Sequence, residues 1–227
     1  MSAVEPVPSG GEVGDPRIKR KGIFLVGDSI AIHYSPWLRD ALGPGYQVDT
    51  KVGLLDALSD LDDPRGMNCG DSDMVLAYVR ERLGESDFQP DLIVINCGLH
   101  DIKTDPATLR TQVPIARYRA NLEAIFRAIL LRHLRFLWVR STPIDEEKHN
   151  RLSQKMFRSQ RDLEDYNRAA DGLAAGHPVA DLHGFTLRQP GELYCDHAHF
   201  TDRIRALQGA FLAGHIAILV PTSPAIS

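Results

Sequence analysis

The run Asp91–Asn96, which reads Asp-Leu-Ile-Val-Ile-Asn and follows Pro90, is the feature that most constrains the fold. Its uninterrupted apolar residues predict a strand that is buried on both faces. Other short apolar runs, at 22–26 and 135–139, are separated from it by segments with apolar residues at helical spacing. Alternation of strands and helices is typical of a parallel sheet that helices cover on both sides. The sequence therefore predicts an α/β fold.

Periodicity and turn residues predict the elements in chain order. We expect strands at 22–26, 46–52, 91–96, 135–139 and 179–182, and helices at 30–42, 74–83, 115–132, 163–175 and 204–219. Asp71 or Ser72 is expected to cap the helix at 74–83, because short polar side chains accept hydrogen bonds from the first N–H groups of a helix. The charged segment 145–158 is expected to form an exposed loop or lid. The result is a central five-stranded parallel sheet.

The composition fits one globular domain. The chain has 227 residues, of which 43% are hydrophobic and 25% charged, and this is enough for a substantial core. We expect a single domain at 21–220, with a flexible N-terminal tail at 1–20 and a C-terminal tail at 221–227. No signal-peptide core occurs at the start, and no apolar run is long enough to span a bilayer.

The net charge and the number of cysteines limit the binding partners and the cellular compartment that we expect for the protein. The formal net charge of −4 gives no footprint for nucleic acid or anionic lipid. The three cysteines form no even framework and favour a reducing compartment, so a cytoplasmic location is expected. The sequence leaves the oligomeric state open.

A serine stands where the first predicted strand ends. Ser29 lies in Gly27-Asp28-Ser29-Ile30, and Asp196 and His199 lie three residues apart near the other end of the chain. A serine hydroxyl becomes a good nucleophile when an imidazole takes its proton, and a carboxylate fixes the tautomer of that imidazole. Ligands bind at the carboxyl edge of open α/β sheets, where Ser29 is expected. These residues predict a serine hydrolase.

Two further blocks each fall just after a predicted strand. Gly70 lies in Asn68-Cys69-Gly70-Asp71-Ser72, and His100 lies in Gly98-Leu99-His100-Asp101. Taken singly, each block also fits a turn, and the Asp196/His199 pair also fits a helix cap. The order of all the blocks along one chain is what makes them specific.

Together these blocks resemble the SGNH, or GDSL-type, hydrolase family of esterases, lipases, thioesterases and carbohydrate deacetylases. The resemblance covers Gly27 to His199. It implies a three-layer flavodoxin-like fold, Ser29 as the nucleophile, and Asp196 and His199 as the acid–base pair. It also implies an oxyanion hole formed by the N–H groups of Ser29 and Gly70, and no metal or organic cofactor.

The third block departs from the pattern, because the family has Gly-x-Asn-Asp and this chain has His100 in place of the asparagine. An imidazole N–H is able to donate to an oxyanion as an amide does. A neutral imidazole donates from one nitrogen only, so its tautomer matters and activity is expected to fall on the acid side. Asn96, on the same strand end, is not assigned this role.

The predicted reaction is two-step acyl transfer from a small or medium acyl ester, such as an O-acetyl group on a sugar or metabolite, to water. An acyltransferase would use the same three residues, and the sequence does not separate the two. A non-catalytic member of the fold that binds an acylated small molecule is a third hypothesis, which His100 motivates.

Other residues carry both a functional and a structural interpretation. Asp28, His33, Arg140 and Thr142 are candidates for the substrate pocket, and the last two fit a capping role equally well. Trp37 is also a candidate for a wall of the pocket, and it fits a packing role at least as well.

The remaining histidines and cysteines have mainly structural interpretations. We expect His149 and Arg151 to be solvated, and His197 to point away from His199. Cys69 and Cys97 are expected to be small buried side chains. Zinc-type cysteine pairs do not occur in the sequence, so no metal site is expected.

Overall fold

The computed structural model describes residues 20–222 apart from 62 and 154. Five parallel strands form one sheet in the order β2-β1-β3-β4-β5. The strands are β1 (Lys21–Val26), β2 (Tyr46–Thr50), β3 (Leu92–Ile95), β4 (Phe136–Val139) and β5 (Val179–Ala180). The predicted five-stranded parallel sheet is therefore confirmed. The predicted tails fall almost entirely outside the described residues, and the domain bounds stay predictions.

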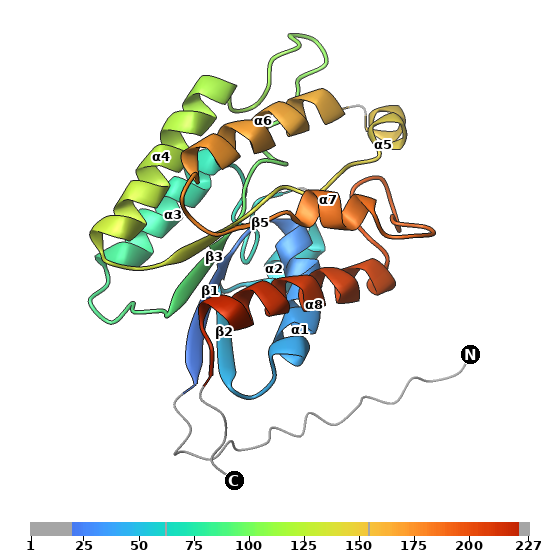
Figure 1. Cartoon of the computed structure of the whole chain (residues 1–227). Coiled ribbons are helices and arrows are strands. Elements are labelled where there is room, and N and C mark those ends of the chain that lie inside the picture. Colours follow the sequence, from blue (N-terminus) through green and yellow to red (C-terminus); the bar gives the residue numbers. More distant parts are fainter. Residues whose placement is uncertain (1–19, 62, 154, 223–227) are drawn as a thin grey trace.

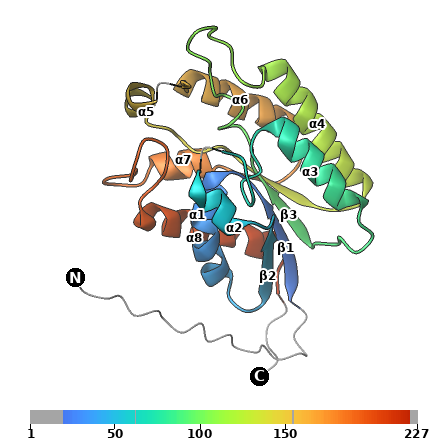
Figure 2. The same ribbon diagram turned by 180° about the vertical axis from the view of Figure 1, so that it is seen from behind.

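Helices cover both faces of the sheet and give the molecule three layers (Figures 1 and 2). The helices are α1 (Ser29–Leu42), α2 (Leu54–Ser59), α3 (Ser72–Gly84), α4 (Ile115–Leu131), α5 (Glu146–Leu152), α6 (Gln160–Leu173), α7 (Leu182–Leu187) and α8 (Asp202–Leu219). In Figure 1, α1 and α8 lie on one side of the sheet, and α3, α4 and α6 lie on the other. This is the flavodoxin-like arrangement. None of the helices described is long and apolar enough to cross a membrane.

The predicted helices are present, with small shifts at their ends. Asp71 caps α3, because its side chain accepts a hydrogen bond from the N–H of Met74 at 3.1 Å. Helix α6 begins at Gln160 rather than at Leu163, because Ser159 caps it and the polar residues just before Leu163 form its first turn.

The prediction of an exposed loop at 145–158 is wrong. Asp145 caps α5, which has glutamates in its first turn and basic residues in its last, so its charges complement the helix dipole. His149 and Arg158 are buried, although both lie in this charged segment. The segment lacks an apolar face, so periodicity gives no signal for a helix that packs through polar side chains.

Helices from the two ends of the chain meet on one side of the sheet, as α1 and α8 do in Figure 1. The crossing is close at Gly209, where a Cβ atom would lie 2.7 Å from the backbone nitrogen of Leu38 and 2.8 Å from Cβ of Trp37. Glycine at 209 permits this approach. Trp37 contributes its backbone and Cβ to the crossing, while the residue is 39% exposed. The crossing brings the segments around residues 29 and 199 together.

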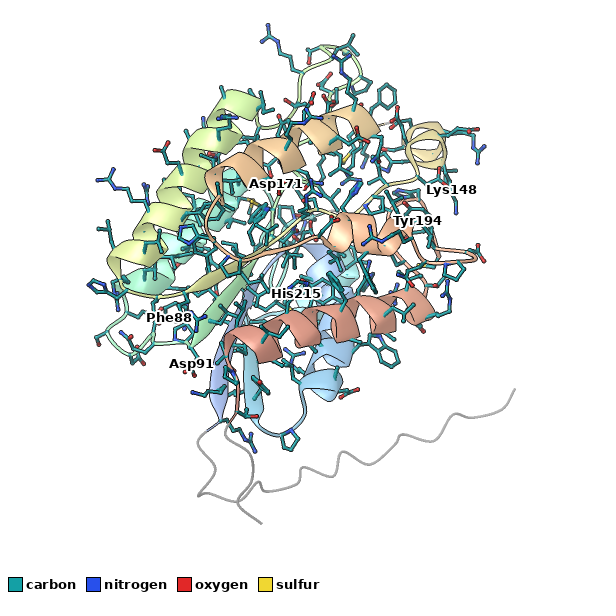
Figure 3. All side chains as sticks on the ribbon, in the orientation of Figure 1. Phe88, Asp91, Lys148, Asp171, Tyr194 and His215 are labelled. Atoms are coloured by element: carbon teal, nitrogen blue, oxygen red, sulfur yellow. The ribbon has the colours of Figure 1, made fainter. Side chains whose placement is uncertain are left out.

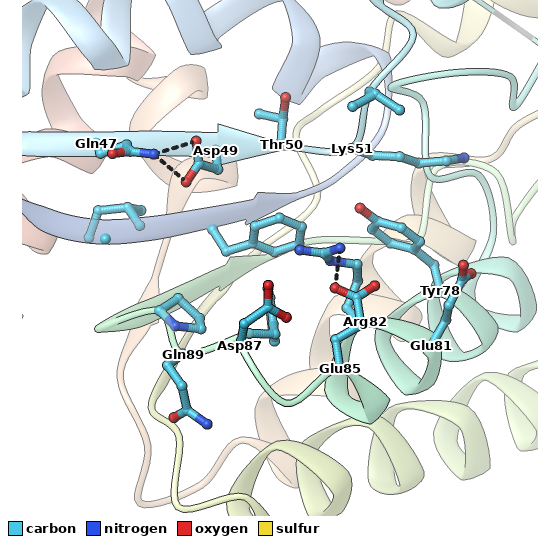
Figure 4. Close-up of a pocket in the computed structure, with 16 residues that line it drawn as sticks. Gln47, Asp49, Thr50, Lys51, Tyr78, Glu81, Arg82, Glu85, Asp87 and Gln89 are labelled. Carbon is cyan, nitrogen blue, oxygen red and sulfur yellow. Dashed lines mark hydrogen bonds and ion pairs between the residues drawn. The ribbon is translucent and has the colours of Figure 1, made fainter.

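An open groove of about 740 Å³ lies beside the first half of β1, between β2 and α3 (Figure 4). Its polar side chains bond to one another, as in the pairs of Gln47 with Asp49 and Arg82 with Glu85. The groove is at the amino end of the sheet, whereas Ser29 follows the carboxyl end of β1. It is therefore separate from the site described next.

Candidate active site

Ser29 is the first residue of α1, directly after the turn that ends β1. Asp28 caps this helix, and its Oδ1 accepts a hydrogen bond from the N–H of Ile30 at 3.0 Å. A Cβ atom at Gly27 would lie 2.5 Å from Cβ of Ala31, so the tight turn requires glycine there. The N–H of Ser29 belongs to the first helical turn, where N–H groups have no acceptor within the helix. The turn thus presents both the hydroxyl and the N–H of Ser29 at the sheet edge.

Asp28 itself is almost completely buried. Burial raises the pKa of its carboxyl, although the N–H of Ile30 and the charge of Arg158 oppose that rise. Its position as a helix cap gives Asp28 a structural role beside the nucleophile.

Asp196 and His199 lie on a hairpin-like loop just before α8. The loop is closed by hydrogen bonds from the N–H of Cys195 to the carbonyl of His199, and from the N–H of Thr201 to the carbonyl of Leu193, both at 2.9 Å. Within it, Oδ1 of Asp196 accepts from the N–H groups of Ala198 and His199, each at 2.7 Å. Aspartate is well suited to such a turn, because its short side chain bonds to the backbone two or three residues on.

The three predicted residues are brought together. Nε2 of His199 lies 3.0 Å from Oγ of Ser29, and Nδ1 of His199 lies 2.7 Å from Oδ2 of Asp196. Burial alone would raise the pKa of Asp196, but hydrogen bonds from Ala198 and His199 outweigh it and lower the pKa to about 2. The carboxylate is therefore ionised at neutral pH and accepts a hydrogen bond from Nδ1–H, which leaves Nε2 as the acceptor facing the serine.

His33 packs against this group. Its ring centroid lies 4.9 Å from that of His199, with the rings in an edge-on arrangement. Burial, together with the charges of Arg205 and His199, lowers the pKa of His33 to about 4. A neutral imidazole thus forms one wall beside the ring of His199, in agreement with the predicted position of His33 at the site.

Gly70 has a positive φ of 73°, and a Cβ atom there would lie 2.6 Å from Sδ of Met74 and 2.7 Å from Cβ of Pro64. Only glycine fits this position. The N–H of Gly70 donates to Oδ1 of Asn68 at 3.0 Å, so the predicted oxyanion donor already has an acceptor within the protein.

His100 is 2% exposed, and its Nδ1 is buried with no hydrogen-bond partner in the part of the chain that the structure describes. Burial lowers the pKa of His100 well below its usual value, and the positive charges of Lys103, Arg158 and His199 lower it further. The ring is therefore neutral and has one N–H to donate.

Asp101, in the same block as His100, supports the block that contains Gly70. Both carboxylate oxygens of Asp101 accept from the N–H of Ser72, at 3.0 and 3.1 Å. Burial raises the pKa of Asp101 to about 7, against the effect of these bonds. Asp101 ties the loop of His100 to the start of α3, directly after Gly70.

The other predicted residues lie elsewhere. The amide of Asn96 donates to the carbonyl of Val139 at 2.8 Å, which agrees with its exclusion from the oxyanion hole. Arg140 forms ion pairs with Asp171 at 2.7 Å and Asp181 at 3.0 Å, so its guanidinium links α6 to the start of α7.

Thr142 is buried, and it lines the same small closed cavity as Arg140 and Tyr34. Among the described residues, no hydrogen bond or ion pair joins Arg140 or Thr142 to Ser29, Asp196 or His199. Cys69 and Cys97 are buried free cysteines, as predicted.

Sequence reasoning missed three side chains from the segment 145–158. Lys148 donates to the carbonyl of Asp196 at 2.9 Å, His149 contacts His197 with 2.7 Å between the Nδ1 atoms, and Nε of Arg158 donates to the carbonyl of Leu99 at 2.9 Å. His149 is therefore buried rather than solvated, whereas the side chain of Arg151 is 67% exposed, as predicted. The ring of His197 turns to His149 rather than into the Ser29 group.

This is a three-layer α/β protein in which a serine, a histidine and an aspartate form a hydrogen-bonded row at the carboxyl edge of the sheet. The chain belongs to the GDSL-like lipase/acylhydrolase family of carboxylic ester hydrolases, whose family model matches residues 23–210. No curated protein is significantly similar to it in sequence.

Several solved structures share its fold. A carbohydrate acetylesterase from Sinorhizobium meliloti is 15% identical, with 88% of this chain and 100% of that chain covered and a TM-score of 0.60. An aryl esterase from M. smegmatis is 17% identical over 88% of this chain and 100% of that chain, with a TM-score of 0.62. A GDSL-like lipase from Bacteroides thetaiotaomicron is 14% identical over 87% and 88%, with a TM-score of 0.63.

Proposed function

We propose that the protein is a serine esterase that hydrolyses a small or medium acyl ester through an acyl-enzyme. The observation that carries the proposal is the 3.0 Å distance between Oγ of Ser29 and Nε2 of His199, whose other ring nitrogen is bonded to Asp196. Ser29 attacks the ester carbonyl while His199 takes its proton. Asp196 fixes the tautomer of His199 and stabilises the imidazolium that forms.

The oxyanion of the tetrahedral intermediate is bound by the N–H groups of Ser29 and Gly70 and by the ring N–H of His100. The N–H of Gly70 exchanges its acceptor on Asn68 for the oxyanion. The neutral state of His100 supports this role, because a neutral imidazole carries one N–H that is able to donate, and Nδ1 of this buried ring has no partner among the described residues.

The intermediate then collapses in the usual order for acyl transfer. The carbon–oxygen bond to the leaving alcohol breaks, and His199 returns its proton to that alcohol. A water molecule next attacks the acyl carbon while His199 takes a proton from it. The bond from that carbon to Oγ of Ser29 then breaks, His199 returns the proton to Oγ, and the acid is released. Protein groups and water supply every proton in this sequence.

The proposed substrate carries a short acyl group, such as an O-acetyl group on a sugar or another polar metabolite. Ser29 is 7% exposed and His199 is 6% exposed, and so narrow an access favours a small acyl chain. The similarity of the fold to a carbohydrate acetylesterase and an aryl esterase also supports this choice.

The test compares hydrolysis of p-nitrophenyl acetate and butyrate by the wild type, Ser29→Ala and His199→Ala. We expect each substitution to lower kcat by at least about 10⁴-fold, because the residues act as a unit. Ser35→Ala, on the same helix but bonded to the carbonyl of Ile32, is the matched control and should keep wild-type activity.

Equal rates in the wild type, Ser29→Ala and His199→Ala would contradict the proposal. A fluorophosphonate probe should label the wild type and not Ser29→Ala. Failure to label a protein that binds an acylated ligand would instead identify a non-catalytic member of the fold. Added alcohols should take only a minor share of the acyl group, and a dominant share would identify an acyltransferase.

A further inference from the structure

Helix α5 is held against the loop that carries Asp196 and His199. Lys148 donates to the carbonyl of Asp196 at 2.9 Å, and His149 lies 2.7 Å from His197 between their Nδ1 atoms. Figure 3 shows Lys148 and Tyr194 at the same end of the molecule, opposite Phe88 and Asp91.

Arg158, at the end of the same segment, is 3% exposed and contacts two parts of the site. Its Nε donates to the carbonyl of Leu99 at 2.9 Å, and its Nη1 lies 3.4 and 3.5 Å from the two ring nitrogens of His149. The side chain of Asn150 bonds to both the N–H and the carbonyl of Arg158, at 2.9 and 3.0 Å. Asn150 therefore holds the backbone of Arg158, while Leu99 and His149 hold its guanidinium.

These contacts form one continuous path across the site. Leu99 immediately precedes His100, and His197 lies two residues before His199. Arg158 stands between the two, because it bonds to Leu99 on one side and contacts His149, the partner of His197, on the other.

We propose that Arg158 is a positioning residue that holds the His100 loop and the His199 loop at a fixed separation, a role that depends on the function proposed above. The bond from a charged donor to the Leu99 carbonyl is stronger than one between neutral groups, so it limits movement of His100. A shift of His100 by about 1 Å would weaken its bond to the oxyanion, because such donors act through their fixed placement.

The charge of Arg158 has a second effect on the same loop. His100 is faced by Lys103 from its own loop, by Arg158 and by His199, and all three oppose its protonation. A positive charge in a buried site also favours a negative oxygen nearby. Arg158 therefore adds to the effects of burial and of Lys103 that keep His100 neutral, and it adds positive potential where the oxyanion forms.

The test uses two variants and a matched control. Arg158→Met removes the charge and the donor, whereas Arg158→Lys keeps the charge and loses the planar donor group. Arg151→Met removes an arginine from α5 whose side chain is 67% exposed, and it is the control. The measurements are kcat and KM on p-nitrophenyl acetate across pH, and the titration of the His100 ring by NMR, assigned through His100→Asn.

We expect Arg158→Met to lower kcat by about 10- to 100-fold with a change in KM below about 3-fold, because the loss falls on the transition state. The pKa of His100 should rise, since a neighbouring positive charge is gone, and the acid limb of the activity should move to higher pH. Arg158→Lys should keep the His100 titration near that of the wild type and recover only part of kcat. Arg151→Met should match the wild type throughout.

The proposal is overturned if Arg158→Met and Arg151→Met have the same kcat and the same His100 titration. Near-UV circular dichroism checks that each variant is folded. If Arg158→Met is not folded, the comparison of Arg158→Lys with Arg151→Met decides alone. A wild-type protein without esterase activity would contradict the proposed function only. In that case the His100 titration still decides whether Arg158 acts on this loop.

Discussion

The acid–base half of the site, Asp196 and His199, and the proposed oxyanion half, Gly70 and His100, differ in how many of their hydrogen bonds are already formed. Both ring nitrogens of His199 are bonded, and Asp196 accepts from two backbone N–H groups as well. By contrast, Nδ1 of His100 is buried without a partner among residues 20–222 as described, and the N–H of Gly70 donates to Asn68.

The difference shows which half of the site is preorganised before a substrate binds. The acid–base half is fixed before a substrate arrives, so little reorganisation is needed for proton transfer. In the proposed mechanism, the oxyanion half must release the N–H of Gly70 from Asn68 and use the ring of His100 as a donor. Four substitutions, at three residues, separate the two halves.

The largest effect among these is expected for Asp196→Asn, which should lower kcat by about 10³- to 10⁴-fold because the amide favours the wrong tautomer of His199. Steady-state hydrolysis of p-nitrophenyl acetate measures it. Asp202→Asn, at an aspartate that pairs with Arg205 and whose side chain is 79% exposed, should leave kcat unchanged. Equal kcat in the two variants would mean that the acid–base half does not need its carboxylate.

The His100 pair tests the oxyanion half. His100→Ala should lower kcat by about 10²- to 10³-fold, the usual effect of losing one oxyanion donor. His100→Asn should keep kcat within about 10-fold, because an amide donates in the same role. Since protonation of His100 is confined to pH well below 6.5, His100→Asn should extend activity only in that acid range. A pH–rate profile and turnover identical to wild type would place His100 outside the oxyanion hole.

The smallest effect on activity is expected for Asn68→Ala, which removes the acceptor of Gly70 and the donor to the Leu61 carbonyl. We expect kcat to change by less than about 10-fold and the free energy of unfolding to fall by about 1–3 kcal/mol, as for other buried groups left unpaired. Urea unfolding measures the second quantity, with Gln47→Ala in the exposed groove as control. A large loss of kcat with unchanged stability would show that Asn68 takes part in the chemistry.

The strands and the row of Ser29, His199 and Asp196 were accessible from the sequence, for different reasons. β3 is an unbroken apolar run, and such runs are determined by local composition. The three site residues were found because their spacing within short blocks is distinctive, and strand ends meet at one edge of a parallel sheet.

The polar packing around the site was not accessible in this way. His149 and Arg158 lie in a charged segment, and their burial depends on the loops of Asp196 and Leu99, which are distant in sequence. The bond between Gly70 and Asn68 depends on a positive φ that a glycine permits but does not require. Contacts of this kind follow from the assembled fold and not from local propensity.

The close crossing of α1 and α8 has a consequence for biosynthesis. During translation, Ser29 leaves the ribosome early, whereas His199 and the helix that seats it emerge only near the end of synthesis. A nascent chain that ends after β4 lacks both His199 and Asp196. Hydrolytic activity would then appear only after α8 has packed against α1, so an unfinished polypeptide would not hydrolyse esters in the cell.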